Sequence, residues 1–521
     1  MFPVDFVPGR ASVKTVLDAA VVFNIGGKTD EPPGIQGVPA YVASDNPAQR
    51  VGRNSWGVKF GSSRSLNPSL REQVLEDAEL REFLPLAPRA GDEVLASSGG
   101  QPIWILRGTG AGSVHWVGAL PLPLLEDQCL WERFRAGCFM RVLPLIVFLR
   151  QLTRENDWQY GRQACFVVDD PSLYWPSYGY LDFRRLAEHA RVHGYYVSVA
   201  TIPLDTRWPN PRTLAIFRAN APRLSLLIHG NDHLKQELAS PRSVEQSVRL
   251  LAQALRRFER LERGDGLEVC RVMEAPHGAF AKDVLEGLRS LDFEGVMASA
   301  DLLVRHNPKV RWSATLGLDA AGLLAEVGLP SIPRIIMTKD WKSSVLLAGV
   351  LDQPLVLAGH HADAADGMER IAEFAQLVQS IGGVTWATPT GILRSNYKQL
   401  RQGRALHIQL CSRRVHLTVP GGVEEIWIHR PWLAPGDDGG GLAVLCGQEQ
   451  RRASQPAGRG VCGPFPVKQT ENLVVACPPK NGVDFKTLAP PPPSLRPVFR
   501  KILVELRDRC GPMVGWKSRY V

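Results

Sequence analysis

The sequence predicts an α/β protein built around a (β/α)7–8 barrel, with an N-terminal α/β accessory domain and a C-terminal β-rich domain. Between residues 160 and 398, short apolar segments of strand type alternate with helical segments, which is typical of a parallel sheet with crossover helices. The texture of the sequence changes on both sides of that region. A chain of 521 residues is also longer than one hydrophobic core usually requires.

Residues 1–155 are predicted to form the accessory domain, which combines strands with a long helix. Strands are expected at Glu93–Ser98, Pro102–Arg107 and Ser113–Leu120, because glycine-rich turns separate these apolar runs. A helical pattern then extends from about Asp127 to Thr153.

Residues 160–398 are predicted to form the barrel, and a doubly wound open sheet is the alternative. One helix is expected at Leu181–His193, ending at Gly194. Another is expected to begin with Ser240 as N-cap and Pro241 in the first turn. The strands are expected at eight apolar runs: Cys165–Val168, Tyr195–Ala200, Leu224–Ile228, Glu268–Met273, Gly295–Ala298, Arg334–Met337, Leu355–Ala358 and Val384–Trp386.

Residues 403–521 are predicted to form a β-sandwich-like domain with a C-terminal helix. Alternating apolar and polar residues predict strands at Ala405–Leu410, Arg414–Val419 and Glu424–His429. A proline run at Pro490–Pro493 is expected to be a stiff linker. It precedes a helix predicted at Pro497–Arg509.

The composition excludes several classes of protein. The net charge is +9, but its 61 basic residues form no long run, so a nucleic-acid partner is not expected. No stretch of 18 apolar residues predicts a membrane span, and the N-terminus does not read as a signal peptide. Nine cysteines without a CxxC pair favour a reducing compartment, the cytoplasm. The oligomeric state is left open.

Titratable residues follow several of the predicted strands. The groups that act in parallel barrels lie at the C-terminal ends of the strands, so these residues are expected to share one site. They are Asp169 and Asp170 after the first strand, Asp205 after the second, His229 and His233 after the third, Glu274 and His277 after the fourth, and His360 and His361 after the seventh.

Asp170, His229 and His233 form a candidate metal site. Two imidazoles in HxxxH spacing can share one ion if a helical turn carries them. The same spacing at His189 and His193 lies within a predicted helix, where it indicates a solvated face. One carboxylate and two imidazoles leave coordination positions open for water, as in catalytic sites. Zinc suits this donor set best, and cobalt, nickel or iron would also fit.

At these residues the sequence resembles the polysaccharide deacetylase family of carbohydrate esterases, part of the glycoside hydrolase and deacetylase barrel superfamily. The segments FVVDD, HGNDH and LVLAGHH are similar to family motifs. The resemblance implies that Asp169 is the catalytic base and that Asp170, His229 and His233 bind the metal. It also implies that His360 or His361 is the catalytic acid.

The third motif of the family departs from its usual form in the segment EAPHG. Glu274 stands where the family has an arginine that steers the base aspartate, and His277 stands where it has a tyrosine. We expect Asp205, Glu274 and His277 to orient the substrate or the metal ligands. Tyr174 and Trp175 are expected to stack on sugar rings or to pack as a lid on the rim of the barrel.

The resemblance implies a metal-dependent hydrolase that removes an acyl group, such as acetyl, from a sugar polymer or glycoconjugate. Two alternatives remain open at this point. Asp169 and Glu274 would be the paired carboxylates of a glycoside hydrolase on the same barrel. A non-catalytic carbohydrate-binding or assembly protein would keep the barrel without its chemistry.

Overall fold

The chain forms two compact units, each of which is described by itself. The first comprises Met1–Asp157, Ser313–Leu318 and Asp340–Leu351, and the second comprises the remaining segments from Trp158 to Val521. The division into three domains stays a prediction. The computed structural model describes residues 20–25, 38–52, 57–108, 112–125, 128–153, 159–240, 242–318, 322–324, 326–432, 441–451, 460–479, 481–492 and 494–513.

The first unit contains a 7-stranded mixed sheet in the order β1-β2-β9-β8-β7-β4-β5. β1, β2 and β9 pair in parallel, and the other neighbours are antiparallel. The ring of Phe148 on α1 lies 5.9 Å from that of Tyr41 on β2. The strands are β1 Ala20–Ile25, β2 Ala40–Asp45, β4 Gly57–Phe60, β5 Val74–Glu76, β7 Glu93–Ser98, β8 Gln101–Arg107 and β9 Val114–Val117, with the separate pair β3 Val51–Gly52 and β6 Glu82–Phe83.

The long helix predicted from about Asp127 to Thr153 is wrong in its first half. The structure has only a 3-10 turn, η3 Leu130–Arg133, before helix α1 Leu143–Thr153. Gly137 adopts a left-handed φ of 79°, which interrupts a helix. Pro144 is the second residue of α1, where its missing N–H leaves no helical hydrogen bond unmade. This unit also contains α7 Trp341–Val350.

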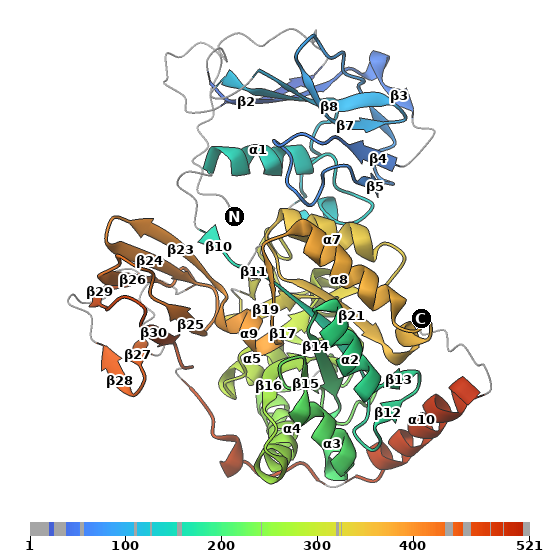
Figure 1. The fold of residues 1–521 in the computed structure, drawn as a ribbon, viewed down its shortest axis with the longest axis vertical. Helices are drawn as coiled ribbons and strands as arrows, with labels where there is room; N and C mark the ends of the chain where they lie inside the picture. The colour runs from blue at the N-terminus through green and yellow to red at the C-terminus, as the bar shows by residue number, and fades with distance from the viewer. Residues whose placement is uncertain are drawn as a thin grey trace. The chain divides into compact units, whose positions relative to one another are not determined.

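The second unit is built on a curled, mostly parallel sheet with helices between its strands (Figure 1). The parallel α/β arrangement predicted from the sequence is present. The strands are β11 Arg162–Asp169, β14 Val197–Thr201, β15 Leu224–His229, β16 Val269–Glu274, β17 Gly295–Ala298, β18 Leu323–Leu324, β19 Leu329–Pro333, β20 Ile335–Ile336, β21 Leu355–His360 and β22 Val384–Trp386.

The strand pairing differs from that of a uniform barrel at two places. The segment Leu329–Ile336 pairs with β17 through β19 and with β21 through β20. β19, next to β18 at one end of the strand order, and β20, at the other end, therefore lie on one continuous segment, which changes its partner at Arg334. The predicted eighth strand, β22, pairs only with the beginning of β11, from Arg162 to Ala164.

The helices of this sheet begin and end at residues that satisfy their terminal backbone groups. Asp182 caps α2, and Gly194 ends it in the left-handed conformation. The predicted start of α4 at Ser240 is wrong, because Ser243 and Gln246 form a capping box three residues later; Pro241 lies outside the described residues. The helices are α2 Phe183–His193, α3 Pro211–Ala219, α4 Val244–Asp265, α5 Lys282–Ser290, α6 Ala300–His306, α8 Glu369–Ile381 and α9 Pro389–Arg394.

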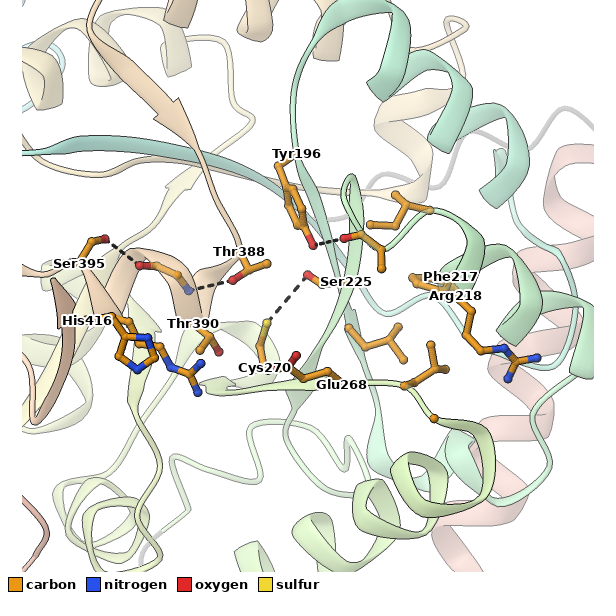
Figure 2. A pocket seen from close by; sticks show the side chains of 17 residues that line it. Tyr196, Phe217, Arg218, Ser225, Glu268, Cys270, Thr388, Thr390, Ser395 and His416 are labelled. Atoms are coloured by element: carbon orange, nitrogen blue, oxygen red, sulfur yellow. Dashed lines mark hydrogen bonds between the residues drawn. The ribbon is translucent and has the colours of Figure 1, made fainter. Parts of the chain in front are cut away.

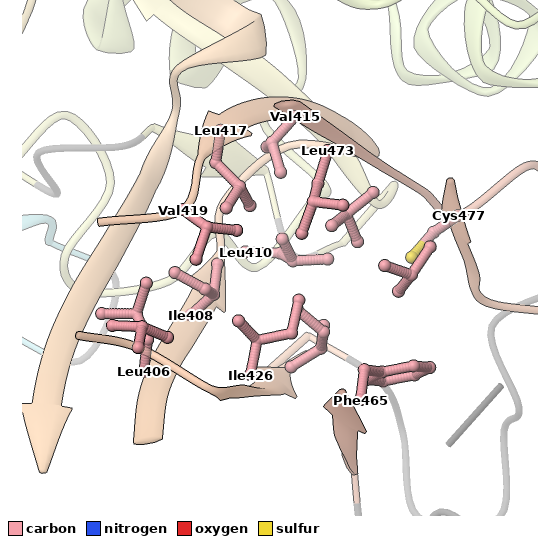
Figure 3. Close-up of a cluster of buried hydrophobic side chains, with 14 residues drawn as sticks. Leu406, Ile408, Leu410, Val415, Leu417, Val419, Ile426, Phe465, Leu473 and Cys477 are labelled. Atoms are coloured by element: carbon pink, nitrogen blue, oxygen red, sulfur yellow. The ribbon is translucent and has the colours of Figure 1, made fainter. Parts of the chain in front are cut away.

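Two smaller sheets enclose a separate apolar core, which Figure 3 shows. Inward residues alternate with outward ones along β24, so Leu406, Ile408 and Leu410 are buried there. The first sheet has the order β10 Gln159–Tyr160, β23 Tyr397–Gln402, β24 Ala405–Leu410, β26 Glu425–His429 and β29 Val461–Pro466; the second has the order β25 Arg414–Thr418, β30 Asn472–Ala476, β27 Ala443–Cys446 and β28 Glu449–Arg451.

The last described helix, α10 Arg496–Met513, lies beside the hairpin of β12 Ser177–Tyr178 and β13 Leu181–Asp182 (Figure 1). The hydroxyl of Tyr178 donates to Asp508 on this helix, over 2.5 Å. Within the described ranges, no helix has both the length and the apolarity needed to cross a bilayer.

Candidate active site

The interior rows of the curled sheet end in titratable side chains. Alternate residues of a strand face the same side, so the residue two positions after a core residue continues its row. Five strands of the sheet follow this rule at their C-terminal ends. The side chains are Asp169 after Val167, His229 after Leu227, Glu274 after Val272, Arg334 after Ile332 and His360 after Ala358.

Asp170 and the two histidines converge as the sequence predicts. Nε2 of His229 lies 3.0 Å from Asp170 Oδ1, and Nε2 of His233 lies 2.9 Å from the same oxygen. One donor atom from each of the three residues lies within 4.8 Å of the others. Burial opposes ionisation of Asp170, but the two imidazoles hold its pKa well below the usual range. Two nitrogens and one carboxylate oxygen at this separation fit a divalent ion such as zinc.

The loop between the two histidines is held by Glu237, which sequence reasoning missed. Its buried carboxylate accepts hydrogen bonds from the backbone N–H groups of Asn231 and His233, at 2.6 and 2.9 Å. His233 has a left-handed φ of 54°, so no helical turn carries the pair, and that expectation was wrong. The HxxxH spacing places both rings together because the chain wraps around one carboxylate.

Asp169 is fixed by a guanidinium from another part of the sheet. Arg334 donates to Asp169 Oδ2, and its Nε lies 2.6 Å from Glu274 Oε1. All three side chains are buried. Burial and the neighbouring Asp169 raise the pKa of Glu274, although Arg334 opposes this shift. A side-chain hydrogen bond also links Glu274 to Asp169, so the carboxylate of Asp169 is held by both neighbours.

The structure separates the two histidines after β21. Nε2 of His360 lies 3.8 Å from Asp170 Oδ2, so this ring belongs to the site. The buried ring of His361 instead packs edge-on against Tyr178, with centroids 5.1 Å apart, and stacks with Tyr180. A Cβ on Gly179 would collide with the ring of His361, so glycine permits this packing.

Helix α10 contributes charged side chains beside the predicted site residues. Lys501 Nζ lies 2.7 Å from Asp205 Oδ2, and the hydroxyl of Tyr174 donates to Asp205 Oδ1 at 3.3 Å. Burial raises the pKa of Asp205 to about 6 against the opposing effect of Lys501. Arg500 donates to His233 Nδ1 at 3.3 Å. Asp205 is therefore an anchor for α10, and its predicted role in orienting the substrate or the candidate metal ligands stays a prediction.

The two remaining predicted residues lie at the rim. The exposed His277 has its ring centroid 5.5 Å from that of His233. Trp175 is exposed, and the guanidinium of Arg509 lies over its ring at 5.2 Å. Tyr174 and Trp175 thus lie against α10, as a lid would, and their stacking on sugar rings stays a prediction.

Arg334 could have been found from the sequence. The rule that identifies Asp169, His229 and Glu274 also applies to the segment SIPRII, where a charged residue follows the core residue Ile332 by two positions. Glu237 and the α10 residues give no comparable sequence signal, because their contacts depend on loop conformation and on helix placement.

A cavity of about 760 Å³ lies at the N-terminal ends of the strands, away from the residues described above (Figure 2). It is lined by the first residues of β15 and by Cys270, whose thiol lies 3.9 Å from Ser225 Oγ. Arg394, also in its wall, forms an ion pair with Glu294. The cavity holds no metal-ligand cluster among the described residues. Chemistry in parallel α/β folds occurs at the C-terminal ends of strands, which favours the Asp170 site.

Comparisons of the sequence return no relative. No protein-family model matches the chain, and no curated protein sequence matches it. Comparison with solved structures does return matches.

The solved structures that are similar to the chain include a candidate polysaccharide deacetylase from Mycobacterium smegmatis, with 13% identity over 46% of this chain and 92% of that one, at a TM-score of 0.33. A family 4 carbohydrate esterase from Streptomyces lividans has 12% identity over 44% of this chain and 92% of its own, at a TM-score of 0.27. A pseudoenzyme of the same esterase family from Bacillus anthracis has 11% identity, over 43% and 67% respectively, at a TM-score of 0.22. These proteins belong to the family whose motifs the sequence resembles, but an activity must be argued from the site itself.

Proposed function

We propose that this chain is a metal-dependent hydrolase that removes an acetyl or related acyl group from a sugar polymer or glycoconjugate. The observation that carries the proposal is the convergence of Asp170, His229 and His233 beside Asp169. This set combines three ligands for a cation with an adjacent carboxylate that can act as a base.

The metal proposed for this site is zinc, held by Asp170 and by the Nε2 atoms of His229 and His233. When bound, such an ion polarises an acyl carbonyl and makes water more acidic. The carboxylate of Asp170 retains its charge at neutral pH, since its pKa is well below the usual range, so it is ready to bind a cation.

Proton transfer is assigned to two further side chains. Asp169 accepts the proton of the attacking water, while Arg334 holds Oδ2 and so fixes the orientation of the carboxylate. His360 is proposed to protonate the leaving alcohol or amine, because its Nε2 lies 3.8 Å from Asp170 Oδ2, the oxygen that does not face the other two histidines. The packing of His361 against two tyrosines makes it the weaker of the two candidates.

The geometry does not favour a glycoside hydrolase with Asp169 and Glu274 as its two carboxylates. Such enzymes place a sugar between carboxyl groups that are roughly 5–9.5 Å apart. Here the same guanidinium binds both groups, and Glu274 is fully buried. A substrate would have to displace Arg334 to reach Glu274.

The carbohydrate substrate and the cytoplasmic location remain parts of this proposal. The sugar would enter from the rim that His277 occupies, where its exposed ring can contact it. The cytoplasm follows from the cysteine pattern of the sequence.

Acetate release from N-acetylated chito-oligomers in the presence of Zn²⁺ tests the proposal. We expect turnover by the wild type and none by His229→Ala/His233→Ala. The matched control is His189→Ala/His193→Ala, which removes a pair of identical spacing from α2 and should keep activity. New reducing ends without acetate would replace the proposal with glycosidic cleavage. Glycan binding without any turnover would replace it with the non-catalytic alternative.

A further inference from the structure

Helix α10 presents polar side chains to the protein and apolar side chains to solvent. Lys501 and Asp508 are buried. A surface helix ordinarily turns its apolar stripe toward the core, so this orientation is inverted. The outward side chains recur at helical spacing and are 51% to 71% exposed: Leu495, Phe499, Ile502, Leu503 and Leu506.

The inward face is fixed by buried polar contacts, so the helix cannot simply roll over to hide its apolar face. Lys501 pairs with Asp205 at 2.7 Å, and Asp508 accepts from Tyr178 at 2.5 Å. Glu505 accepts from Ser172 Oγ at 3.1 Å. Rolling the helix would carry Lys501 away and leave the buried carboxylate of Asp205 without its cationic partner, which is strongly unfavourable.

Two exposed tryptophans extend the apolar face of the helix. Trp175 and Trp208 are 54% and 61% exposed. A cavity of about 390 Å³ is lined by Trp208 together with Ile502 and Leu506, so the surface of the helix continues onto the loop after β14. We call the four outward residues of α10, Leu495 directly before the helix, and the two tryptophans Trp175 and Trp208 the α10 patch. It gathers seven of the thirteen large apolar side chains that are exposed in the described chain.

Arginines border this patch. The guanidinium of Arg207 lies 4.5 Å from the centroid of the Trp208 ring, and that of Arg509 lies 5.2 Å from the centroid of Trp175. Arg496 and Arg500 are on α10 itself, and the whole chain carries a net charge of +9. Apolar and tryptophan side chains with flanking arginines are the composition of a helix that lies in the headgroup region of a bilayer.

We propose that the α10 patch docks onto an anionic lipid bilayer surface. The apolar side chains enter the boundary between headgroups and acyl chains, and the bordering arginines meet lipid phosphates. The patch and the residues that hold α10 on Asp205 are on opposite faces of the helix, so docking does not require the helix to leave the protein.

Co-sedimentation of the full chain with vesicles tests this proposal. We compare vesicles of phosphatidylcholine alone with vesicles that also contain about one-third phosphatidylglycerol. Wild type should sediment with the anionic vesicles, and less as salt is raised. Phe499→Ser/Leu503→Ser should bind about tenfold or more weakly, since each substitution removes a large apolar side chain from the bilayer contact. The control Val74→Ser/Val192→Ser changes two residues that are 62% exposed outside the patch and should bind as wild type does.

Three results would overturn the proposal: no sedimentation of the wild type, equal binding to neutral vesicles, or equal binding by Phe499→Ser/Leu503→Ser. A concentration-dependent dimer that the same variant abolishes, measured by light scattering, would assign the patch to a second copy of the chain instead. Vesicle binding by His229→Ala/His233→Ala should equal that of wild type. Loss of the proposed hydrolytic function would therefore leave this result unchanged.

Discussion

Arg334 illustrates how one side chain can determine the geometry of its neighbours. Its guanidinium lies between the carboxylates of Asp169 and Glu274, and all three groups are buried. Without it, two carboxylates would remain close together in a medium that disfavours charge, so at least one would take up a proton. The orientation of the Asp169 carboxylate depends on the same contact.

Arg334→Ala should therefore reduce both stability and turnover. Loss of one partner from a buried ion pair costs about 3–5 kcal/mol. We expect kcat to fall by about 100-fold or more with little change in KM, because Arg334 acts through Asp169 and not on the substrate. Urea unfolding and initial rates measure the two effects.

The matched control is Arg394→Ala, which breaks the ion pair with Glu294 near the cavity at the other ends of the strands. It should lower stability and leave kcat unchanged. Equal losses of kcat in both variants would show that Arg334 has only a structural role.

Asp205 should give the stability of the fold a characteristic pH dependence. Its pKa is about 6 in the folded chain, above the ordinary value of 3.8. The folded state therefore keeps this proton longer, and the resulting stabilisation is present below pH 4 and lost as the pH rises through 6. The shift corresponds to about 3 kcal/mol. As the pH rises from 4 to 6, the free energy of unfolding should fall less in Asp205→Asn than in wild type, as measured by urea unfolding. Parallel pH profiles would contradict the assignment.

The sequence predicts that Asp170, His229 and His233 come together, because two of them lie at strand ends, which apolar runs reveal. The pair Asp169-Asp170 follows one such run directly, and His229 follows another. The predicted strand Arg334–Met337 instead begins with Arg334, which hides that this residue directly follows the end of the preceding strand β19. Arg334 and its partner Asp169 are 165 residues apart in the sequence. The spacing of apolar residues along the chain does not reveal a contact over that distance.

The loop from His229 to His233 is the element on which the metal site depends most. The carboxylate of Glu237 accepts hydrogen bonds from backbone N–H groups of this loop, and Gly230 has a left-handed φ of 62°. A side chain at Gly230 would collide with Glu237 Oε1 and lie 2.7 Å from Pro276 Cγ.

Gly230→Ala should weaken divalent metal binding by about tenfold or more, since the supports of metal ligands are commonly worth 10–100-fold in affinity. The control is Gly266→Ala, at a glycine of nearly the same φ, 65°, where an added Cβ meets nothing within 4 Å. Both substitutions carry the backbone penalty, so only the collision distinguishes them. Isothermal titration with Zn²⁺ measures both, and equal affinities would refute the role of the loop.

Helix α10 also affects the metal ligands, through Arg500. An arginine can only donate, so the contact requires His233 Nδ1 to accept, which leaves the proton on Nε2. A ligand nitrogen must instead be unprotonated. Arg500→Met should therefore raise Zn²⁺ affinity, by about threefold to tenfold, as its positive charge is removed. Arg496→Met, exposed on the same helix, is the control. Unchanged affinity in Arg500→Met would contradict this prediction.

The sequence predicts which helices and strands exist better than it predicts where they begin and end. Ala405–Leu410 matches because its apolar and polar residues alternate, and Glu93–Ser98 matches because a glycine-rich turn bounds its apolar run. The helix from about Asp127 failed because apolar residues around Gly137 suit a packed turn as well as a helix. For α10, the sequence gives the helix but not its inverted orientation, which depends on the distant Asp205.

Metal binding should stabilise one of the two compact units selectively. The three ligands all belong to the second unit. Zn²⁺ at about 100 times its dissociation constant should add about 2.7 kcal/mol to the stability of that unit. Calorimetry should show its transition moving to higher temperature in wild type and in His189→Ala/His193→Ala, but not in His229→Ala/His233→Ala. A shift confined to the first unit would contradict the assignment.

The parallel α/β plan of the second unit could be predicted, because alternation of strand and helix patterns is a property of long stretches of sequence. Its deviation from a uniform barrel could not. Whether neighbouring strands close evenly depends on register and twist, which arise only when the strands pack.

The segment Leu329–Ile336 has one more consequence, for solubility. β17 and β21 each find a second neighbour in it, so neither presents a bare row of backbone donors and acceptors to solvent. Such rows act as templates for association with other chains. A mutation that detaches the segment Leu329–Ile336 would expose the backbone edges of β17 and β21 at the same time. Aggregation, before any loss of chemistry, is then the expected phenotype.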